Sequence, residues 1–195
     1  MNNKSDKVPH VCPWYMAYLF DNPLRTLFHD PVKILGEYVK PGMTVLDIGC
    51  GMGFFSLGMA KMVGPEGKVL AVDLQTRMLE VLEKRARRRG LLERIERRLV
   101  GEEAFSKKST IDFALCFWMV HEVPDQALFF RQLNQALKPG AHVLIAEPGM
   151  NHVKMEDLEK TVTLATAEGF LEIQRPRVRM SLAVVLQKQG LVSGI

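Results

Sequence analysis

The stretch VLDIGCGMGFF, residues 45–55, places an acid and three glycines at the end of an apolar run. Gly49, Gly51 and Gly53 allow the chain to turn sharply and bring backbone N–H groups against a ligand. Their spacing departs from the dinucleotide fingerprint, which needs a further glycine where this chain has Phe54. The loop is therefore a poor site for a pyrophosphate and a candidate site for another ligand.

Two acids indicate the charge of that ligand. Asp47 precedes the first glycine, and its carboxylate would repel a diphosphate but would bind an ammonium group directly or through water. Asp73 ends the next apolar run, near the spacing of roughly 20 residues at which a carboxylate binds ribose hydroxyls. Together the two acids predict an adenosine that carries an amino-acid tail.

Two further titratable residues are candidates for proton transfer. His121 follows the apolar run 111–118, and an imidazole with a pKa near neutrality suits a general base. Glu147 lies near the end of the run 141–148 and is the second candidate. The sequence leaves two roles for His121: a catalytic base, or a histidine that only caps a helix or fills the core.

The length and composition of the chain indicate one soluble globular domain. It has 195 residues, of which 47% are hydrophobic and 25% charged, enough to bury one sizeable core. We expect a single domain over residues 1–195. Within it, the aromatic, proline-punctuated segment 1–40 predicts a cap of short helices broken at Pro23 and Pro31, and residues 41–195 form the cofactor-binding core.

The cysteines and the N-terminal residues predict the compartment. Cys12, Cys50 and Cys116 form no close pair and no metal-ligand spacing, which favours reduced thiols and no metal site. The start of the chain lacks the uninterrupted apolar core of a signal peptide. Because the apolar stretches are also too short to cross a bilayer, we expect a cytoplasmic protein without a membrane span.

A basic run over residues 84–98 contributes much of the formal net charge of +4. Such a run can bind phosphates, and it supports an alternative in which the protein modifies RNA. Aromatic residues do not interleave with it, as platforms for nucleic acids usually require, so we interpret it as a solvated helix face. We therefore do not expect nucleic acid as the partner.

Short apolar runs alternate with helical patterns from residue 41 onward, which is typical of βαβ units and a parallel sheet. Strands are predicted over residues 43–49, 68–74, 94–100, 111–118, 141–148, 170–174 and 181–187. The last strand is expected to be antiparallel, because little chain separates it from the one before. Apolar residues at helical spacing predict helices after the second strand, before residues 138–140, and over residues 155–168.

Four motifs in chain order carry a family resemblance. VLDIGCGMGFF, VLAVDLQTRML, IDFALCFWMVHEVPD and LKPGAHVLIAEP resemble the successive motifs of class I S-adenosylmethionine (SAM)-dependent methyltransferases. The resemblance is strongest to the "type 11" group near the ubiquinone and menaquinone C-methyltransferases, and it outweighs a nicotinamide-binding alternative. It implies a Rossmann-like α/β fold with seven strands in the order 3-2-1-4-5-7-6, flanked by helices, with the ligand crevice at the carboxyl ends of strands 1 and 4.

The resemblance also implies which residues hold SAM. Asp47 and the three glycines would surround the methionine part, and Asp73 would bind the ribose hydroxyls. Leu74 would line the adenine, and the backbone near Phe117 would meet the amino group of the cofactor. The chain departs from the family after the third strand, where LVGEEAF replaces the usual adenine-binding residues, and Glu102 or the next glutamate is the candidate substitute.

The acceptor is expected to be a small, partly apolar molecule. The fourth strand ends without the Asn/Asp-Pro-Pro-aromatic motif of enzymes that methylate amino groups in nucleic acids and proteins, and no RNA-binding module is attached. The candidate substrate-binding residues are aromatic: Trp14, Tyr15, Tyr18 and Trp118. The resemblance suggests that the first three close over the crevice, while plain packing is the alternative.

These observations predict a SAM-dependent methyltransferase. Methyl transfer from a sulfonium is an in-line displacement, so the protein has to align the acceptor, exclude water and, for protic acceptors, take a proton. The acceptor atom stays open among oxygen, nitrogen, carbon and sulfur. Besides the RNA modifier, a protein that binds SAM without catalysis is the second alternative.

Overall fold

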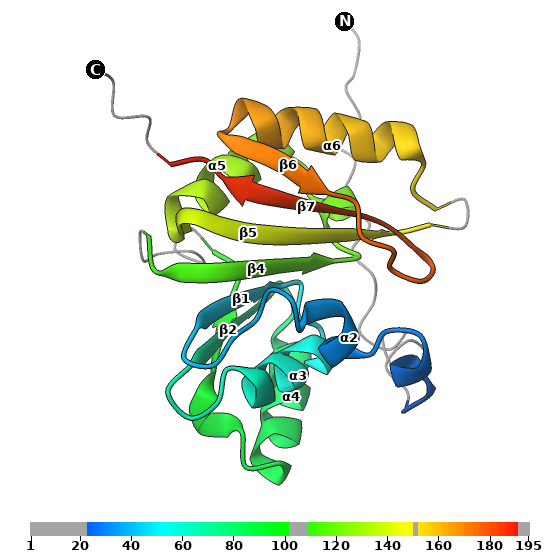
Figure 1. Ribbon diagram of the computed structural model, residues 1–195. Coiled ribbons are helices and arrows are strands. Elements are labelled where there is room, and N and C mark those ends of the chain that lie inside the picture. The colour runs from blue at the N-terminus through cyan, green and yellow to red at the C-terminus, as the bar shows by residue number, and fades with distance from the viewer. Residues whose placement is uncertain (1–22, 102–108, 150–151, 191–195) are drawn as a thin grey trace, which may run out of the picture.

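Seven strands form one sheet in the order β3-β2-β1-β4-β5-β7-β6 within the residues that the structure describes (Figure 1). The structure is a computed structural model and describes residues 23–101, 109–149 and 152–190. Strands β1 to β5 run parallel, and β7 is antiparallel to both of its neighbours. The strands are β1 Thr44–Ile48, β2 Lys68–Asp73, β3 Ile95–Leu99, β4 Ile111–Phe117, β5 Leu137–Pro148, β6 Phe170–Gln174 and β7 Ser181–Lys188.

Helices cover both faces of this sheet, as Figure 1 shows. One face carries α2 Pro31–Leu35, α3 Phe54–Met62 and α4 Thr76–Arg88. The opposite face carries α5 Gln126–Ala136 and α6 Met155–Ala167. Short 3-10 helices are η1 Pro23–Leu27, η2 Leu92–Arg94 and η3 Val120–Glu122.

Alternating side chains of the central strands supply the two apolar layers. On β1, Val45 packs into the cluster formed with α2, α3 and α4, whereas Leu46 packs into the cluster formed with α5 and α6. Both side chains have no exposed surface. Burial on two faces explains why consecutive residues of β1 are apolar and why apolar and polar residues do not alternate along it.

The α/β class, the seven strands, their order and the antiparallel last strand are confirmed. Two features differ substantially from the sequence prediction. Strand β5 begins at Leu137 instead of residue 141, and Pro139 is tolerated there because the β4–β5 ladder is irregular between Ile111 and Phe113. Pro23 and Pro31 begin helices rather than break them, which suits proline because a first-turn N–H has no partner within the helix.

The described part of the N-terminal segment lies near the carboxyl ends of the parallel strands. In Figure 1 the blue helices η1 and α2 lie on the side toward which the β4 arrow points. Nε2–H of His29 donates a 2.8 Å hydrogen bond to the carbonyl oxygen of Arg179, in the turn between β6 and β7. Across residues 23–101, 109–149 and 152–190, every helix is too short or too polar to cross a membrane.

Candidate functional site

The glycine loop begins where β1 ends and continues into α3. The backbone N–H groups of Gly49 and Cys50 both donate to the carbonyl oxygen of Val72, at 2.9 and 3.0 Å, so the loop is tied to β2. Gly49, Gly51 and Gly53 all have positive φ, as the sequence analysis predicted for a sharp turn.

The three glycines meet different surroundings. A Cβ on Gly53 would lie 2.1 Å from Cδ1 of Leu82, so this glycine lets α4 pack against the loop. A Cβ on Gly49 would lie 2.9 Å from Cβ of Met119. A Cβ on Gly51 would meet nothing within 4 Å, so the backbone at Gly51 borders open space.

Asp47 is a buried carboxylate under this loop, with 2% of its surface exposed. Its Oδ2 accepts a hydrogen bond from the hydroxyl of Ser56 on α3. Burial raises the pKa of Asp47 to about 6, against the opposing effect of that hydrogen bond. The charge of Asp73 raises this pKa further and the charge of Arg25 lowers it, so the three charges share one neighbourhood.

Asp73 ends β2 and faces the same loop. Its Oδ2 accepts a 2.8 Å hydrogen bond from the backbone N–H of Gly51, and its Oδ1 accepts one of 2.9 Å from the N–H of Gln75. Burial raises the pKa of Asp73, and these backbone donors oppose the shift. The structure thus brings together both acids that the sequence singled out.

An apolar surface lies next to Asp73. The side chain of Leu74 is 58% exposed, and Leu99 and Val100 at the end of β3 are also exposed. Val100 N–H donates to the carbonyl oxygen of Asp73 at 2.9 Å, which holds the two strand ends together. These three side chains place exposed apolar surface near the Asp73 carboxylate.

Strand β4 ends in an uncommon backbone conformation. Trp118 has a φ of +58°, in the left-handed region that bulky residues rarely adopt, and its N–H donates to Ala146 at 2.7 Å. Its indole N–H donates to the hydroxyl of Ser181 at 2.9 Å, and its ring lies near the buried ring of Phe117. The bend directs the chain from β4 into η3, where His121 lies.

His121 and Glu147 form a hydrogen-bonded pair. Nδ1 of His121 donates to Oε2 of Glu147, whose side chain is 2% exposed. Oε1 of Glu147 accepts a 2.8 Å hydrogen bond from the N–H of Val120, and Gln126 donates to the Val120 carbonyl oxygen at 3.0 Å. Both oxygens of the Glu147 carboxylate therefore accept hydrogen bonds. Because Nδ1 of His121 is held by Glu147, the orientation of the ring is fixed and Nε2 is the nitrogen that can take up a proton.

The protonation of His121 follows from its neighbours. Burial lowers its pKa, but the hydrogen bond and charge of Glu147 and the charge of Glu122 outweigh this effect, so the net shift is upward. The exposed His152 ring contacts the His121 ring edge-on, with 5.1 Å between the ring centres. The arrangement suits a base that accepts a proton at Nε2.

Several predicted residues lie outside the described part of the chain. These are Trp14, Tyr15, Tyr18 and Glu102. Sequence reasoning in turn missed Arg25, His29, Ser56 and His152, which lie beside the predicted residues. The contacts of Arg25, His29 and His152 join segments that are distant in the sequence. Ser56 is the exception, because its position in the first turn of α3 after the glycine loop could have indicated it.

Part of the basic run stabilises the fold. Arg85 donates to the carbonyl oxygen of Met52 in the glycine loop at 3.1 Å, and Arg94 donates to that of Ala60 on α3 at 3.2 Å. Arg87 and Arg97 both pair with Glu83, at 2.8 and 2.5 Å. These contacts favour the interpretation of the run as a helix face with internal partners over that of an RNA-binding surface.

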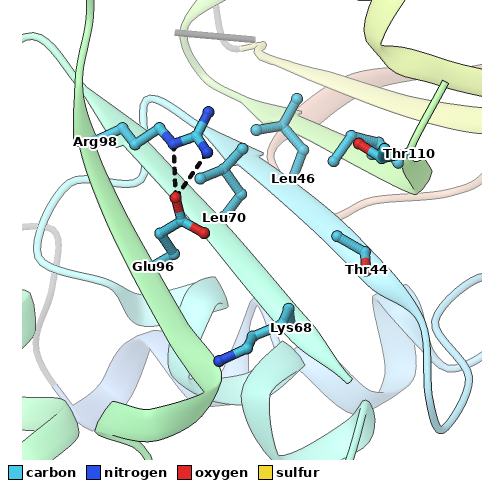
Figure 2. A pocket seen from close by; sticks show the side chains of 8 residues that line it. Thr44, Leu46, Lys68, Leu70, Glu96, Arg98 and Thr110 are labelled. Carbon is cyan, nitrogen blue, oxygen red and sulfur yellow. Dashed lines mark hydrogen bonds and ion pairs between the residues drawn. The ribbon is translucent and has the colours of Figure 1, made fainter. Parts of the chain in front are cut away.

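A hollow of about 350 Å³ lies elsewhere on the sheet (Figure 2). Thr44, Lys68 and Ile111, which begin β1, β2 and β4, are among its lining residues, and the Arg98–Glu96 ion pair crosses one side. Open α/β sheets bind ligands at the carboxyl ends of their strands, so this hollow is separate from the candidate site. Among the residues that the structure describes, no group of three or more His, Cys, Asp or Glu side chains is arranged to hold a metal ion.

Comparison with known families matches residues 39–181 to a methyltransferase domain. The chain belongs to this family. It has a class I SAM-dependent methyltransferase domain, a family in which SAM is the methyl donor, as the four sequence motifs indicated. The crystal structure of a SAM-dependent methyltransferase from Aquifex aeolicus is 27% identical, with a TM-score of 0.78, and the match covers 90% of this chain and 97% of that one.

Curated relatives match this chain over a shorter stretch. It is 35% identical over 132 residues to the ubiquinone biosynthesis O-methyltransferase of Leptothrix cholodnii, a match covering 67% of this chain and 53% of the relative. It is 30% identical over 112 residues to the demethylmenaquinone methyltransferase of Staphylococcus aureus, covering 56% and 44%. The chain thus spans about half the length of the curated relatives it matches.

Proposed function

We propose that SAM binds across the carboxyl ends of β1 and β2. Asp47 would bind the ammonium group, Asp73 the ribose hydroxyls and Leu74 the adenine, with the backbone near Phe117 alongside. The open space beside Gly51 supports this placement because a ligand can approach the backbone there. The buried carboxylate of Asp47 supports it because a buried charge is stabilised by a group of opposite charge. When bound, SAM supplies an electrophilic methyl group on a sulfonium.

We propose further that the acceptor is a small, partly apolar molecule methylated on a hydroxyl oxygen. The single observation that carries this proposal is the His121–Glu147 pair. Glu147 holds the imidazole with Nδ1 protonated, so Nε2 of His121 accepts the hydroxyl proton as the oxygen attacks. The Glu147 carboxylate stabilises the imidazolium that results.

The relatives narrow the class of acceptor. One is named as an O-methyltransferase of ubiquinone biosynthesis and another as a demethylmenaquinone methyltransferase, so both names refer to quinones. A phenolic hydroxyl on a small aromatic ring fits this chemistry, because its proton is acidic enough for transfer to an imidazole. We therefore propose a phenol of the quinone-precursor kind as the acceptor.

The placement of SAM is tested by calorimetry with S-adenosylhomocysteine. Asp73→Ala should weaken binding at least tenfold, because a charge-assisted contact to the ribose is lost. Glu80→Gln, which changes an exposed acid paired with Arg77 on α4, is the control and should bind as the wild type does. Unchanged affinity in Asp73→Ala would overturn the placement.

The acceptor class is tested by transfer of label from methyl-tritiated SAM to a panel of catechols and hydroquinones. Label should enter the ether-soluble phenol fraction with wild-type protein and not with His121→Ala. A protein that binds S-adenosylhomocysteine but labels no member of the panel, and no other metabolite of a cell extract, would be a binding protein without catalysis.

The N-terminal residues are proposed to belong to the same domain. In the described part, Cζ of Arg25 on η1 lies 4.5 Å from the ring centre of Phe54 on α3, and a Cβ on Gly58 of α3 would lie 2.6 Å from Cβ of Pro31 on α2. His29, between η1 and α2, is hydrogen-bonded to the turn between β6 and β7. This close approach supports residues 1–40 as a cap of a single domain over 1–195.

A further inference from the structure

Exposed apolar side chains gather on η1, α2 and the turn between β6 and β7. Leu27 is 71% exposed, Val32 63%, Met180 43% and Phe28 39%. The Phe28 ring lies against the guanidinium of Arg179, with 4.4 Å between Cζ and the ring centre, so the two segments are in contact. In Figure 1 both segments lie on the side toward which the β4 arrow points. We call Leu27, Phe28, Val32 and Met180 the apolar patch.

The apolar patch is tied to the end of β4. The His29 ring, next to the patch, contacts the rings of Phe117 and Trp118 edge-on, with 5.0 and 5.3 Å between ring centres. Its Nε2–H donates to the carbonyl oxygen of Arg179, and the indole N–H of Trp118 donates to the hydroxyl of Ser181, the first residue of β7. The patch therefore borders the proposed site where β4 leads into η3.

Basic side chains surround the apolar patch. Lys33 on α2 and Arg177 and Arg179 in the turn are exposed, and within the described ranges no acidic side chain forms an ion pair with any of them. Asp30 lies in the same segment, but its carboxylate is held as the N-cap of α2, where Oδ1 accepts a 2.9 Å hydrogen bond from a backbone N–H. Glu37 is the next acid along the chain and follows the end of α2. The charge around the patch is therefore net positive.

This combination fits an anionic lipid surface better than a second protein. Apolar side chains that project from short helices and a turn can insert below lipid headgroups, and nearby Lys and Arg side chains attract anionic lipids. A second copy of this chain, paired through the same surface about a twofold axis, would bring two sets of cations together. A peptide usually occupies a groove on its partner, whereas Leu27 and Val32 stand out from the surface.

We propose that the apolar patch docks the protein on the surface of an anionic bilayer. Leu27 and Val32 enter the headgroup region, while Lys33 and Arg177 contact lipid phosphates. Docking brings the site edge of the sheet next to the lipid, where an apolar acceptor concentrates. The delivery of the acceptor rests on the proposed function, but the docking itself does not.

Sedimentation with lipid vesicles tests the docking. The wild type should sediment with vesicles of phosphatidylcholine and phosphatidylglycerol, and its binding should fall as salt screens the headgroup charge. Leu27→Ser with Val32→Ser should lower the partition coefficient about tenfold or more, because two apolar side chains no longer insert. Leu164→Ser with Leu171→Ser is the matched control, since both are exposed leucines on α6 and β6, outside the patch, and should bind as the wild type does. Circular dichroism checks that both variants are folded.

Charge reversal separates the electrostatic part of the docking from the apolar part. Lys33→Glu with Arg177→Glu should lower the partition onto anionic vesicles about tenfold or more, and change it less than about twofold on pure phosphatidylcholine. Arg88→Glu with Arg89→Glu makes the same change in net charge at the end of α4, and it should bind as the wild type does. Equal weakening by the two reversals would show that only the net charge matters and would overturn the assignment to the patch.

The remaining outcomes separate the docking from the proposed function. A wild type that does not sediment with anionic vesicles, or equal loss in the Leu27→Ser, Val32→Ser variant and its control, overturns the docking. A wild type that dimerises without lipid through contacts that this variant loses, and that binds no vesicles, would assign the patch to a second copy instead. If docking holds but no phenol is labelled, only the proposed function fails. If both hold, the variant should methylate a vesicle-borne phenol more slowly than the wild type, and water-soluble catechol at the wild-type rate.

Discussion

At the scale of single residues, His121 gives the proposed chemistry a measurable pH dependence. Its pKa is raised above 6.5 by Glu147 and Glu122 against the effect of burial. Because the base must be unprotonated, kcat/KM should increase with pH through a pKa above 6.5 and then level off. His121→Ala should lower kcat about 10² to 10⁴-fold, the usual contribution of a positioned base.

Glu147→Gln separates orientation from charge in the same experiment. Without the carboxylate, the pKa of His121 should fall, so the acid limb of the pH–rate profile should move to lower pH while the plateau drops. His152→Gln is the control, since it changes an exposed ring beside His121 and should leave the profile in place. An acid limb that stays at the wild-type pH in Glu147→Gln would refute the pairing.

The buried Asp47 makes the free protein less stable than it would otherwise be. Its pKa of about 6 exceeds the ordinary 3.8, so the folded state holds a proton that the unfolded state releases. Stability from this group is thus present below about pH 4 and is lost as pH rises through 6, a cost of roughly 3 kcal/mol at pH 7. Asp47→Asn should therefore raise the free energy of unfolding at pH 7 by up to about that amount while weakening SAM binding.

Urea denaturation at pH 4 and pH 7 checks this expectation. The gain in Asp47→Asn should be large at pH 7 and should shrink toward pH 4, where the wild-type carboxyl is protonated. A variant less stable than the wild type at both values would show that Asp47 serves the fold rather than the cofactor.

How far the sequence predicts the site depends on where the partners of each residue lie. Asp47 and Asp73 could be predicted from the sequence because both lie near the end of a strand beside a glycine loop. The carboxyl ends of neighbouring parallel strands meet at one edge of the sheet. The pairing of His121 with Glu147 depends on how η3 turns after β4, which no local spacing reveals. Arg25 and His29 belong to no sequence motif. They contact residues that are far away in the sequence, so nothing local indicates their positions.

At the scale of elements, the packing of α4 against the glycine loop depends on Gly53. Its φ is +84°, and an added Cβ would lie 2.1 Å from Cδ1 of the fully buried Leu82. Gly53→Ala should therefore destabilise the protein by about 2–5 kcal/mol, from backbone strain and overpacking together. Gly51→Ala meets only the strain of a positive φ and should cost about 1–2 kcal/mol.

Thermal or urea unfolding of the two variants measures the difference. Leu82→Ala in the Gly53→Ala background should cost less than it does in the wild type, because it removes the contact that the new methyl group strains. Equal destabilisation by Gly53→Ala and Gly51→Ala would mean that α4 does not depend on the absence of a side chain at Gly53.

The boundaries of elements show where sequence patterns succeed and where they fail. The apolar runs predicted the strands within one residue or so, except for β5, because buried strands are nearly uniform in composition. Lys138, Pro139 and Gly140 read as a helix stop, and α5 does end just before them. Strand β5 begins directly after α5, at Leu137, because Leu137 pairs with Ile111 of β4. Composition alone does not predict this pairing.

At the scale of the whole molecule, the positive charge is divided between structural and solvent-facing arginines. Arg85 holds the Met52 carbonyl oxygen of the glycine loop, so Arg85→Ala should weaken binding of S-adenosylhomocysteine several-fold. Reversing Arg88 and Arg89 to glutamate should leave this affinity within about twofold. RNA binding that falls steeply with salt and is abolished by the reversal would instead favour the RNA-modifying alternative.

The whole architecture follows from a few local features read together. Alternation of apolar runs and helices predicted a parallel sheet, and the family motifs supplied its order, including the reversal between β1 and β4 that opens a crevice. The N-terminal segment was predicted only as a cap. Its position beside the glycine loop, and with it the guanidinium of Arg25, emerges only once the chain is folded.

A crystal structure of the protein with S-adenosylhomocysteine bound would show where the cofactor lies relative to the residues proposed to hold it. We expect the ribose hydroxyls at Asp73, the adenine against Leu74 and the sulfur facing Nε2 of His121. The nucleoside bound in the hollow lined by Thr44 and Lys68, or with its sulfur turned away from His121, would contradict this expectation.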